Sequence, residues 1–379
     1  MMQFYDQLCI LIKPTEACNL RCIYCFNKDN GYCDGIMNMD TLEKLYSTMF
    51  PFYKSIAIVW HGGEPTFVGT RFYKKALELE AEYAKKYDVS VKNSMQTNAT
   101  LLTDDFIDLY EKYHFSVGIS YDGVVNDYTR NSTTEVLSSI KKLQQRNIRP
   151  GVITVVSNKN IDLLIDTYNQ MKSLDVGVQF NHYIEMNLQN PNAELSLDLD
   201  HYVDKMYELY LYWFNDRSGN VSVNPFTTNI EQYLTQNSSI CIHSSCLRSW
   251  MCMDYMGNLS PCDKLFPEQY RYGNINDYSD IRQVYYTDGY KNLLGSSVAR
   301  RKKCIADCSI YKYCQGGCNH SAMVEGDIEN NGGFSCLAFQ KLFTKITSHL
   351  DDIALTCENI QDKVINPYLR DYLINRLQN

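Results

Sequence analysis

The sequence predicts an α/β protein with a parallel sheet in its first half, then a cysteine-rich region and a helical tail. From residue 7 to about 184, six short apolar runs alternate with five amphipathic stretches. Strand–helix units of this kind build parallel sheets with right-handed crossovers. Of the fifteen cysteines, five stand before position 34 and ten after position 240. This uneven distribution predicts that the thiols serve defined sites near the two ends of the chain.

The predicted strands are short runs rich in apolar and β-branched residues. They cover Leu8–Lys13, Ser55–Trp60, Val91–Gln96, Phe115–Ser120, Gly151–Val156 and Val176–Tyr183. Helices are predicted between them, near 40–50, 70–87, 103–113, 133–147 and 160–173. A partly closed barrel is the natural architecture, and a flat, doubly wound sheet is the alternative. In both, ligands bind where the strands end at their carboxyl side.

Three cysteines, Cys18, Cys22 and Cys25, follow the first predicted strand at the spacing C-x3-C-x2-C. Three thiolates hold three irons of a 4Fe–4S cube and leave the fourth iron open to a small molecule. The alternatives are three unrelated buried cysteines or a zinc site. Because structural zinc usually takes a closed set of four ligands with C-x2-C pairs, the spacing favours the iron–sulfur cluster.

The ends of the next three strands carry polar residues and glycines. The second strand ends in His61-Gly62-Gly63-Glu64-Pro65, where the glycines allow close approach to a ligand and Glu64 suits an ammonium group. The third ends in Gln96-Thr97-Asn98, and the fourth in Ser120-Tyr121-Asp122-Gly123. Arg130, shortly afterwards, suits a carboxylate or a ribose. Each motif alone is typical of a turn. Their succession at four strand ends predicts a ligand pocket.

Composition excludes several classes of protein. The net charge of −8 argues against nucleic-acid binding and a basic membrane-binding face. The only dense basic run, Arg300-Arg301-Lys302-Lys303, is interpreted as a solvated face. We find neither a signal peptide nor about 18 uninterrupted apolar residues, so no membrane span is expected. Fifteen cysteines without a secretion signal indicate metal ligands in a reducing compartment, and we expect a cytoplasmic protein.

The second half of the chain is predicted to contain a long helix, a link, a hairpin and a helical tail. Leu197 to Phe214 is predicted to form a core-packing helix, and a Ser-, Gly-, Asn- and Pro-containing link near 218–229 to mark a domain boundary. Asp254 to Cys262 is predicted to form a hairpin that turns at Gly257-Asn258. The tail from about 337 to 379 is predicted to be helical.

Eight thiols of this half form two spaced groups, which fit two four-cysteine iron–sulfur clusters or two zinc sites. Spacing alone does not separate the two, but the iron–sulfur candidate upstream favours iron. The eight are Cys241, Cys246, Cys262, Cys304, Cys308, Cys314, Cys318 and Cys336.

Taken together, the three-cysteine loop, the Gly-Gly-Glu-Pro turn, Gln96-Thr97-Asn98 and Ser120-Tyr121-Asp122-Gly123 resemble the radical S-adenosylmethionine (SAM) enzymes. The later cysteines resemble the SPASM extension of that superfamily through Gly257-x4-Cys262 and Cys308-x5-Cys314-x3-Cys318 followed by Cys336. Cys304 departs from the pattern, because three residues rather than two separate it from Cys308. The resemblance covers roughly residues 8–349.

The resemblance implies a partial (βα)6 TIM-like barrel, a SPASM domain with two auxiliary clusters and a helical tail, over 1–230, 231–349 and 350–379. It implies SAM and three [4Fe–4S] clusters as cofactors. Cys18, Cys22 and Cys25 would hold the cluster that binds SAM. The first auxiliary cluster would be held by Cys241, Cys246, Cys262 and Cys318, and Cys252 could replace one of these ligands. The second auxiliary cluster would be held by Cys304, Cys308, Cys314 and Cys336. The residues implied to contact SAM are Tyr24, Gly63, Glu64, Ser120 and Arg130.

The implied activity is removal of a hydrogen atom from a peptide or protein substrate, with ferredoxin or flavodoxin as electron donor. One interpretation is a maturase that forms a thioether or carbon cross-link in a ribosomally made peptide. The alternative is an anaerobic sulfatase-maturating enzyme, which oxidises Cys or Ser to formylglycine. A non-catalytic iron–sulfur electron carrier is a third possibility from another class.

Asp263 matches an acid that removes the substrate proton in sulfatase maturases, although a hairpin-end aspartate that binds nearby amides explains it equally well. Two departures count against a sulfatase maturase. His61 stands where those enzymes usually carry Gln, and Lys264-Leu265-Phe266 replaces an aromatic-rich stretch. The sequence therefore favours the cross-linking peptide maturase.

Overall fold

The computed structural model describes residues 6–27, 35–186, 192–237, 241–243, 246–264, 266–330 and 332–377. Cys33 and Leu265 therefore lie outside the described residues. The chain forms two compact units. The first comprises Met1–Ser120, Arg130–Pro150 and Ser245–Ser296, and the second comprises Tyr121–Thr129, Gly151–Ser244 and Ser297–Asn379. The predicted domains follow other boundaries and stay a prediction.

The sheet of the first unit contains the first four predicted strands, in the order β1-β2-β3-β4 and all parallel. Hydrogen bonding places Ile12 opposite Trp60 and Trp60 opposite Met95, so the carboxyl ends of neighbouring strands share one edge. The bounds lie within one residue of the prediction: β1 Gln7–Ile12, β2 Ser55–Trp60, β3 Ser90–Thr97 and β4 Ser116–Ser120.

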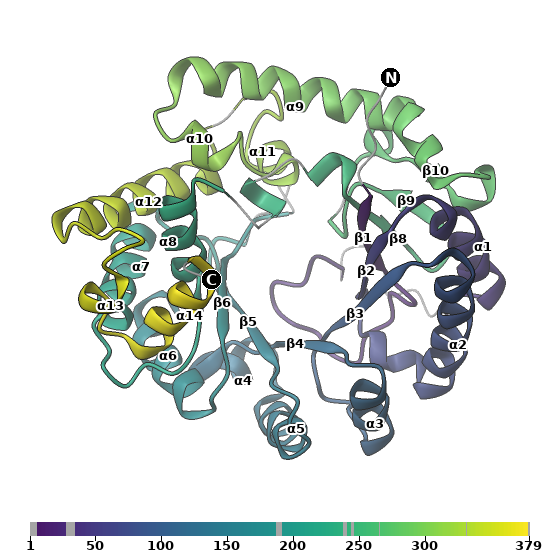
Figure 1. Ribbon diagram of the computed structural model, residues 1–379, viewed down its shortest axis with the longest axis horizontal. Coiled ribbons are helices and arrows are strands. Elements are labelled where there is room, and N and C mark those ends of the chain that lie inside the picture. The colour runs from purple at the N-terminus through teal and green to yellow at the C-terminus, as the bar shows by residue number, and fades with distance from the viewer. Residues whose placement is uncertain are drawn as a thin grey trace. The chain divides into compact units, whose positions relative to one another are not determined.

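Amphipathic helices cover one side of these strands (Figure 1). In α1, the side chain of Asn38 caps the first turn by accepting a hydrogen bond from Asp40 N, and Leu42, Leu45 and Met49 are buried. The predicted helices are confirmed as α1 Met39–Met49, α2 Thr70–Tyr87, α3 Asp104–Lys112 and α5 Thr133–Gln145.

A further strand, β8 (Trp250–Met253), lies parallel to β1 on the edge opposite β2. It continues into the predicted hairpin, because β9 (Asn258–Ser260) returns antiparallel to β8 and β10 (Gly273–Asn274) pairs with β9. Gly257 in the turn has a φ of +87°, a conformation that favours glycine. The hairpin is confirmed, while its attachment to β1 was not predicted.

The core of the first unit contains a buried acid on α2. The Nε1 of Trp60 donates to Asn93 Oδ1 at 2.9 Å, and Asn93 Nδ2 donates to Glu80 Oε1 at 2.8 Å. Glu80 is 8% exposed. Burial raises the pKa of Glu80 from 4.5 to about 7, against the opposing effect of the hydrogen bond from Asn93.

Replacing Glu80 with glutamine is expected to stabilise the protein at pH 8. Because the folded pKa lies above the unfolded pKa, the stabilisation from protonated Glu80 is full below pH 4.5 and is lost as the pH rises through about 7. The loss is about 3 kcal/mol, and neutral glutamine avoids it. Denaturant unfolding at pH 5 and pH 8 should show the gain mainly at pH 8. Glu78→Gln, at an exposed position of the same helix, is the control; an equal gain in both variants would contradict the prediction.

The second unit contains the parallel strands β5 Gly151–Val156, β6 Val178–His182 and β7 Val223–Asn224. The predicted core helix is confirmed as α7 (Leu199–Phe214), which buries Tyr202, Met206 and Trp213 among others. The predicted helical tail is also confirmed. Helix α9 (Asp288–Asp307) begins in the first unit and ends in the second. The other α-helices of the second unit are α4 Asn126–Thr129, α6 Leu164–Ser173, α8 Phe226–Thr235, α10 Tyr311–Cys314, α11 Asn319–Val324, α12 Phe334–Asp352, α13 Ile360–Lys363 and α14 Pro367–Leu377.

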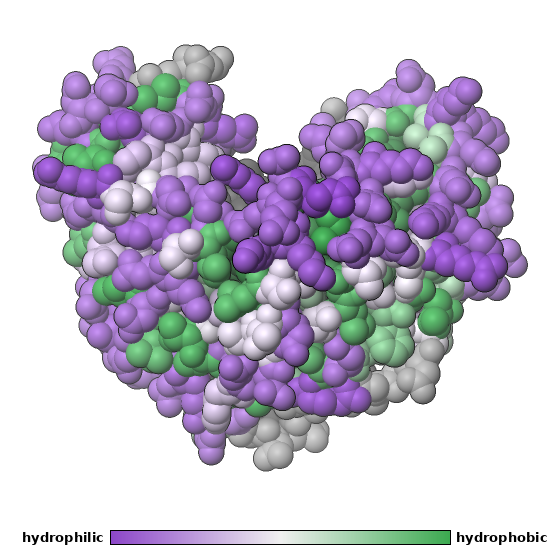
Figure 2. Space-filling model, turned by 90° about the horizontal axis from the view of Figure 1, so that it is seen from below, coloured by the Kyte–Doolittle hydropathy of each residue, from purple (hydrophilic) through white to green (hydrophobic). Residues whose placement is uncertain are grey.

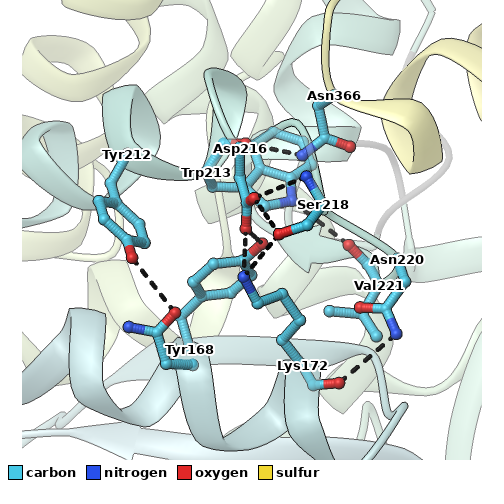
Figure 3. Close-up of polar contacts among 10 residues, drawn as sticks. Tyr168, Lys172, Tyr212, Trp213, Asp216, Ser218, Asn220, Val221 and Asn366 are labelled. Atoms are coloured by element: carbon cyan, nitrogen blue, oxygen red, sulfur yellow. Dashed lines mark hydrogen bonds and ion pairs between the residues drawn. The ribbon is translucent and has the colours of Figure 1, made fainter.

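The stretch 218–229, predicted as a link, is structured: it contains β7 and the start of α8. Hydrogen bonds connect the preceding loop, which carries Asp216, to α6 (Figure 3). Asp216 Oδ2 accepts from Lys172 Nζ at 2.7 Å and from the Tyr168 hydroxyl at 2.8 Å. Although burial alone raises the pKa of Asp216, bonds from Lys172, Ser218 and Tyr168 hold it well below its usual range. These contacts explain why a polar, glycine-containing loop is ordered.

The face in Figure 2 is mostly hydrophilic, with small groups of hydrophobic residues scattered across it. Single exposed apolar side chains are normal on a protein surface. Among the described residues, no helix has the length and apolar character that crossing a membrane requires.

Candidate active site

The loop that carries Cys18, Cys22 and Cys25 follows β1 directly. Cys22 is buried, and Cys18 and Cys25 are half-buried. The Cys18 sulfur accepts hydrogen bonds from the Leu20 backbone N–H at 3.4 Å and from Asn98 Nδ2 at 3.8 Å. Burial raises the pKa of Cys18, and the charges of Glu64 and Cys25 add to it. Three thiols on one short loop, with N–H donors on sulfur, fit the cysteine ligands of an iron–sulfur cluster.

The two glycines after β2 pack against the backbone of the cysteine loop. Gly63 N–H donates to Thr15 O at 3.1 Å, and Glu64 N–H donates to Ala17 O at 2.8 Å. A Cβ atom on Gly63 would lie 2.2 Å from Ala17 O, so no other residue fits without moving the loop. The Gly-Gly pair therefore fixes the cysteine loop against the end of β2.

Glu64 is fully buried and its carboxylate accepts four hydrogen bonds. Oε1 accepts from Thr66 N, Thr66 Oγ1 and Thr97 Oγ1 at 3.0, 2.6 and 2.6 Å, and Oε2 accepts from Asn98 N at 2.7 Å. Burial raises the pKa of Glu64, and these hydrogen bonds oppose the rise. Because each carboxylate oxygen has about two acceptor sites, Oε1 is fully used within the protein and Oε2 keeps one site. The predicted contact of Glu64 with an ammonium group stays a prediction.

The other predicted SAM contacts lie in the same unit. Arg130 Nε donates to the Tyr24 hydroxyl at 2.6 Å, and the guanidinium carbon lies 5.4 Å from the centre of that ring. The Ser120 hydroxyl at the end of β4 accepts from Gln96 Nε2 at 2.9 Å. Hydroxyl and guanidinium groups are thus held in place at the carboxyl edge of the sheet, where the sequence predicts the ligand pocket.

Lys13, His61 and Asp263 are three ionisable residues that interact electrostatically around the ends of β1 and β2. The backbone N–H of His61 donates to Ile12 O at 2.9 Å, and the backbone N–H of Lys13 donates to Met253 O at 2.9 Å. His61 Nδ1 accepts from Gly62 N at 2.8 Å, which leaves the proton of the neutral ring on Nε2. Burial lowers the pKa of His61; the charge of Asp263 opposes this effect, and the charges of Lys13 and Lys264 add to it.

Asp263 is held ionised by its neighbours. Burial alone raises the pKa of this carboxyl, but the charges of Lys264 and Lys13, together with its interaction with His61, outweigh burial and lower the pKa. An ionised carboxylate at the sheet edge is able to accept a proton. Lys13, which sequence reasoning treated only as the end of a strand, is 6% exposed, and a buried lysine without a nearby acid is rare.

The four thiols assigned to the second auxiliary cluster belong to the second unit and interact electrostatically with one another. The charges of Cys336, Cys308 and Cys304 add to the burial that raises the pKa of Cys314 to about 12. The Cys314 sulfur receives a backbone hydrogen bond from Gly316, and the Cys336 sulfur one from Gly332. Four neighbouring thiols with N–H donors fit a four-cysteine cluster.

The thiols assigned to the first auxiliary cluster are divided between the units. Cys246 and Cys262 belong to the first unit, where both act electrostatically on the buried phenol of Tyr272. Cys241 and Cys318 belong to the second. Cys252, the predicted substitute ligand, is 2% exposed on β8, and burial raises its pKa to about 12. Among the described residues, no three His, Cys, Asp or Glu side chains converge closely enough to hold a single metal ion.

The interpretation of the basic run as a solvated face is wrong for its first residue. Arg300 is 0% exposed. Its guanidinium donates to Gly316 O at 2.8 Å, Ile328 O at 2.5 Å and Asn319 Oδ1 at 2.5 Å. It therefore fixes the loop between Cys314 and Cys318 from inside the unit.

Comparison with known proteins decides the family. The pattern of the radical SAM superfamily matches residues 12–171, which include the cysteine loop and all five predicted SAM contacts. A serine-type anaerobic sulfatase-maturating enzyme from Klebsiella aerogenes is 31% identical over 350 residues, which cover 86% of this chain and 83% of the relative. This chain belongs to the radical SAM superfamily and to the family of these maturases. A cysteine-type enzyme from Clostridium novyi (strain NT) is 28% identical over 372 residues, 92% of this chain and 98% of the relative.

Solved structures confirm the fold of this radical SAM enzyme. The structure of native anSMEcpe with bound AdoMet and Cp18Cys peptide matches with a TM-score of 0.82 at 24% identity, over 92% of this chain and 99% of that one. Streptococcus suis SuiB bound to S-adenosylmethionine matches with a TM-score of 0.64 at 19% identity, over 88% of this chain and 77% of that one. The predicted α/β fold, a partial barrel with a C-terminal domain, is confirmed, and the electron-carrier alternative is not retained. The family implies SAM and a 4Fe–4S cluster.

Proposed function

We propose that this radical SAM enzyme oxidises a cysteine or serine side chain of a sulfatase to formylglycine. Similarity to maturases of both types, over more than four fifths of each chain, carries the proposal. It replaces the cross-linking activity that the sequence favoured. The two departures, His61 and the residues after Asp263, are local, whereas the similarity extends over the barrel and the C-terminal domain.

The proposed assignment of residues follows the sequence. Cys18, Cys22 and Cys25 hold the SAM-binding cluster, and Tyr24, Gly63, Glu64, Ser120 and Arg130 form the SAM site. The ligand sets of the two auxiliary clusters, eight cysteines in all, give three [4Fe–4S] clusters. A cytoplasmic location and ferredoxin or flavodoxin as electron donor complete the proposal.

The bound SAM and clusters supply acceptors for the hydrogen atom of the substrate Cβ and for one further electron. The protein has to remove the remaining proton, from the thiol or hydroxyl of the substrate side chain. We assign this step to Asp263, because the charges of Lys264 and Lys13 keep its carboxylate ionised. Serine then gives the aldehyde directly, and cysteine gives a thioaldehyde that water hydrolyses to the aldehyde and hydrogen sulfide.

The experiment uses the anaerobically reconstituted enzyme, SAM and dithionite with peptides that span a sulfatase modification site, containing Cys, Ser or Ala. We expect 5′-deoxyadenosine, and an aldehyde that a hydrazide reagent captures, from the Cys peptide, the Ser peptide or both. The Ala peptide should give no aldehyde. A thioether or carbon cross-link without aldehyde would instead identify the cross-linking maturase.

Asp263→Asn is expected to lower aldehyde formation by about 100-fold or more, the usual contribution of a positioned base, while iron content stays unchanged. Asp288→Asn, at a highly exposed position at the start of α9, is the matched control. Unchanged aldehyde formation in Asp263→Asn, with clusters intact, would remove Asp263 from the mechanism without affecting the proposed reaction.

A further inference from the structure

Tyr272, just before β10, carries a buried hydroxyl without a partner. The residue is 1% exposed, and among the described residues its Oη has no hydrogen-bond partner. Its backbone N–H donates to Leu259 O at 2.9 Å, and its ring packs edge-on against Tyr290 with centres 6.0 Å apart. Buried hydroxyls of this kind are uncommon in native proteins, and each calls for an explanation such as a bound water or ligand.

The position of Tyr272 in the hairpin suggests which ligand. Gly273 pairs with Leu259, which places Tyr272 next to Ser260, and Ser260 pairs with Cys252. Cross-strand neighbours share one face of a sheet. Cys262 follows Ser260 by two residues, and the thiols of both Cys246 and Cys262 lie within electrostatic reach of the Tyr272 phenol. Both thiols belong to the ligand set that we assign to the first auxiliary cluster.

We infer that Tyr272 donates a hydrogen bond to the first auxiliary cluster, at the sulfur of Cys246 or Cys262 or at a cluster sulfide. The inference rests on the ligand set in the proposed function. Tyr272 touches no reacting atom and is a positioning residue for the electron acceptor. Because a hydrogen bond to sulfur stabilises the more negative, reduced form, it raises the reduction potential of the cluster. A higher potential favours uptake of the electron that leaves the substrate.

Tyr46 offers a matched control. It is also a fully buried tyrosine of the first unit whose hydroxyl has no hydrogen-bond partner among the described residues. Its pKa is raised by burial and by the charge of Glu80, without a contribution from any thiol. Tyr46→Phe thus removes a buried hydroxyl of the same kind away from the cysteines.

The test measures iron content and the midpoint potentials of the clusters, by EPR-monitored redox titration, in the reconstituted holoenzyme, Tyr272→Phe and Tyr46→Phe. We expect full iron in all three and a shift of one auxiliary cluster to a more negative potential in Tyr272→Phe only. Full iron with an unchanged potential in Tyr272→Phe, or an equal shift in Tyr46→Phe, would overturn the inference.

A second measurement uses the unaltered holoenzyme, so that it does not depend on the folding of a variant. In D2O, pulsed EPR of the reduced auxiliary cluster should detect a coupled, exchangeable deuteron, and its absence would overturn the inference. Failure of the proposed function is distinguishable: a shifted potential without aldehyde product would contradict only the reaction. Only about four irons per chain in the unaltered protein would remove the auxiliary clusters and this inference with them.

Discussion

Replacing Cys22 with alanine is expected to abolish the formation of 5′-deoxyadenosine and to lower the iron content by about four per chain. Cys22 is the buried central thiol of the loop after β1, and the loop has no spare cysteine among its described residues. Two thiolates hold only two irons of the cube, so the cluster that binds SAM should be lost. Iron analysis and chromatographic detection of 5′-deoxyadenosine after dithionite reduction measure both effects.

Cys357→Ala is the matched control for this variant. Cys357 is half-buried in the tail after α12 and belongs to none of the three proposed ligand sets. The control should keep the iron content and the SAM cleavage of the unaltered protein. If Cys22→Ala still cleaved SAM at an appreciable rate, Cys22 would not be a ligand, and a different thiol would complete the cluster.

The strands were predictable because each is a local pattern. The apolar runs of β2 and β5 have the predicted bounds, and the others agree within about two residues. The position of β8 was not predictable in this way. Its parallel pairing with β1 places Trp250 opposite Cys9. No local periodicity records a contact between residues so far apart in the chain, although the contact brings Cys252 and the hairpin beside the cysteine loop.

In the site, too, features that depend on neighbouring residues were predicted, and contacts between residues distant in the sequence were not. The spacing of Cys18, Cys22 and Cys25 is local and sufficed to predict a cluster. For Glu64, the sequence predicted an acceptor for an ammonium group, whereas its carboxylate accepts from Thr97 and Asn98, more than thirty positions away. Arg300 was assigned to a solvated face because its neighbours in sequence are basic. Its acceptors, Gly316 O and Ile328 O, come from later loops.

Because its hydrogen bonds connect two strand ends to the cluster loop, Glu64 is expected to contribute more to stability than to direct binding of SAM. Thr66 belongs to the turn after β2, and Thr97 and Asn98 lie at the end of β3. Asn98 in turn donates to the Cys18 sulfur at 3.8 Å and to Asn19 Oδ1 at 3.0 Å. A change at Glu64 should therefore displace Cys18, a proposed cluster ligand with which Glu64 shares no hydrogen bond.

Glu64→Gln is expected to destabilise the protein by about 1–3 kcal/mol, since glutamine places an NH2 group where one carboxylate oxygen accepts, and a stranded buried donor costs about that much. With Oε1 retained, the stranded donor is the N–H of Asn98. Thr66→Val, which removes only the hydroxyl donor to Oε1, should cost about 1 kcal/mol. Denaturant unfolding without SAM measures the loss, and SAM affinity is measured separately. Unchanged unfolding with weaker SAM binding would show instead that Glu64 acts as a direct ligand, as the sequence predicted.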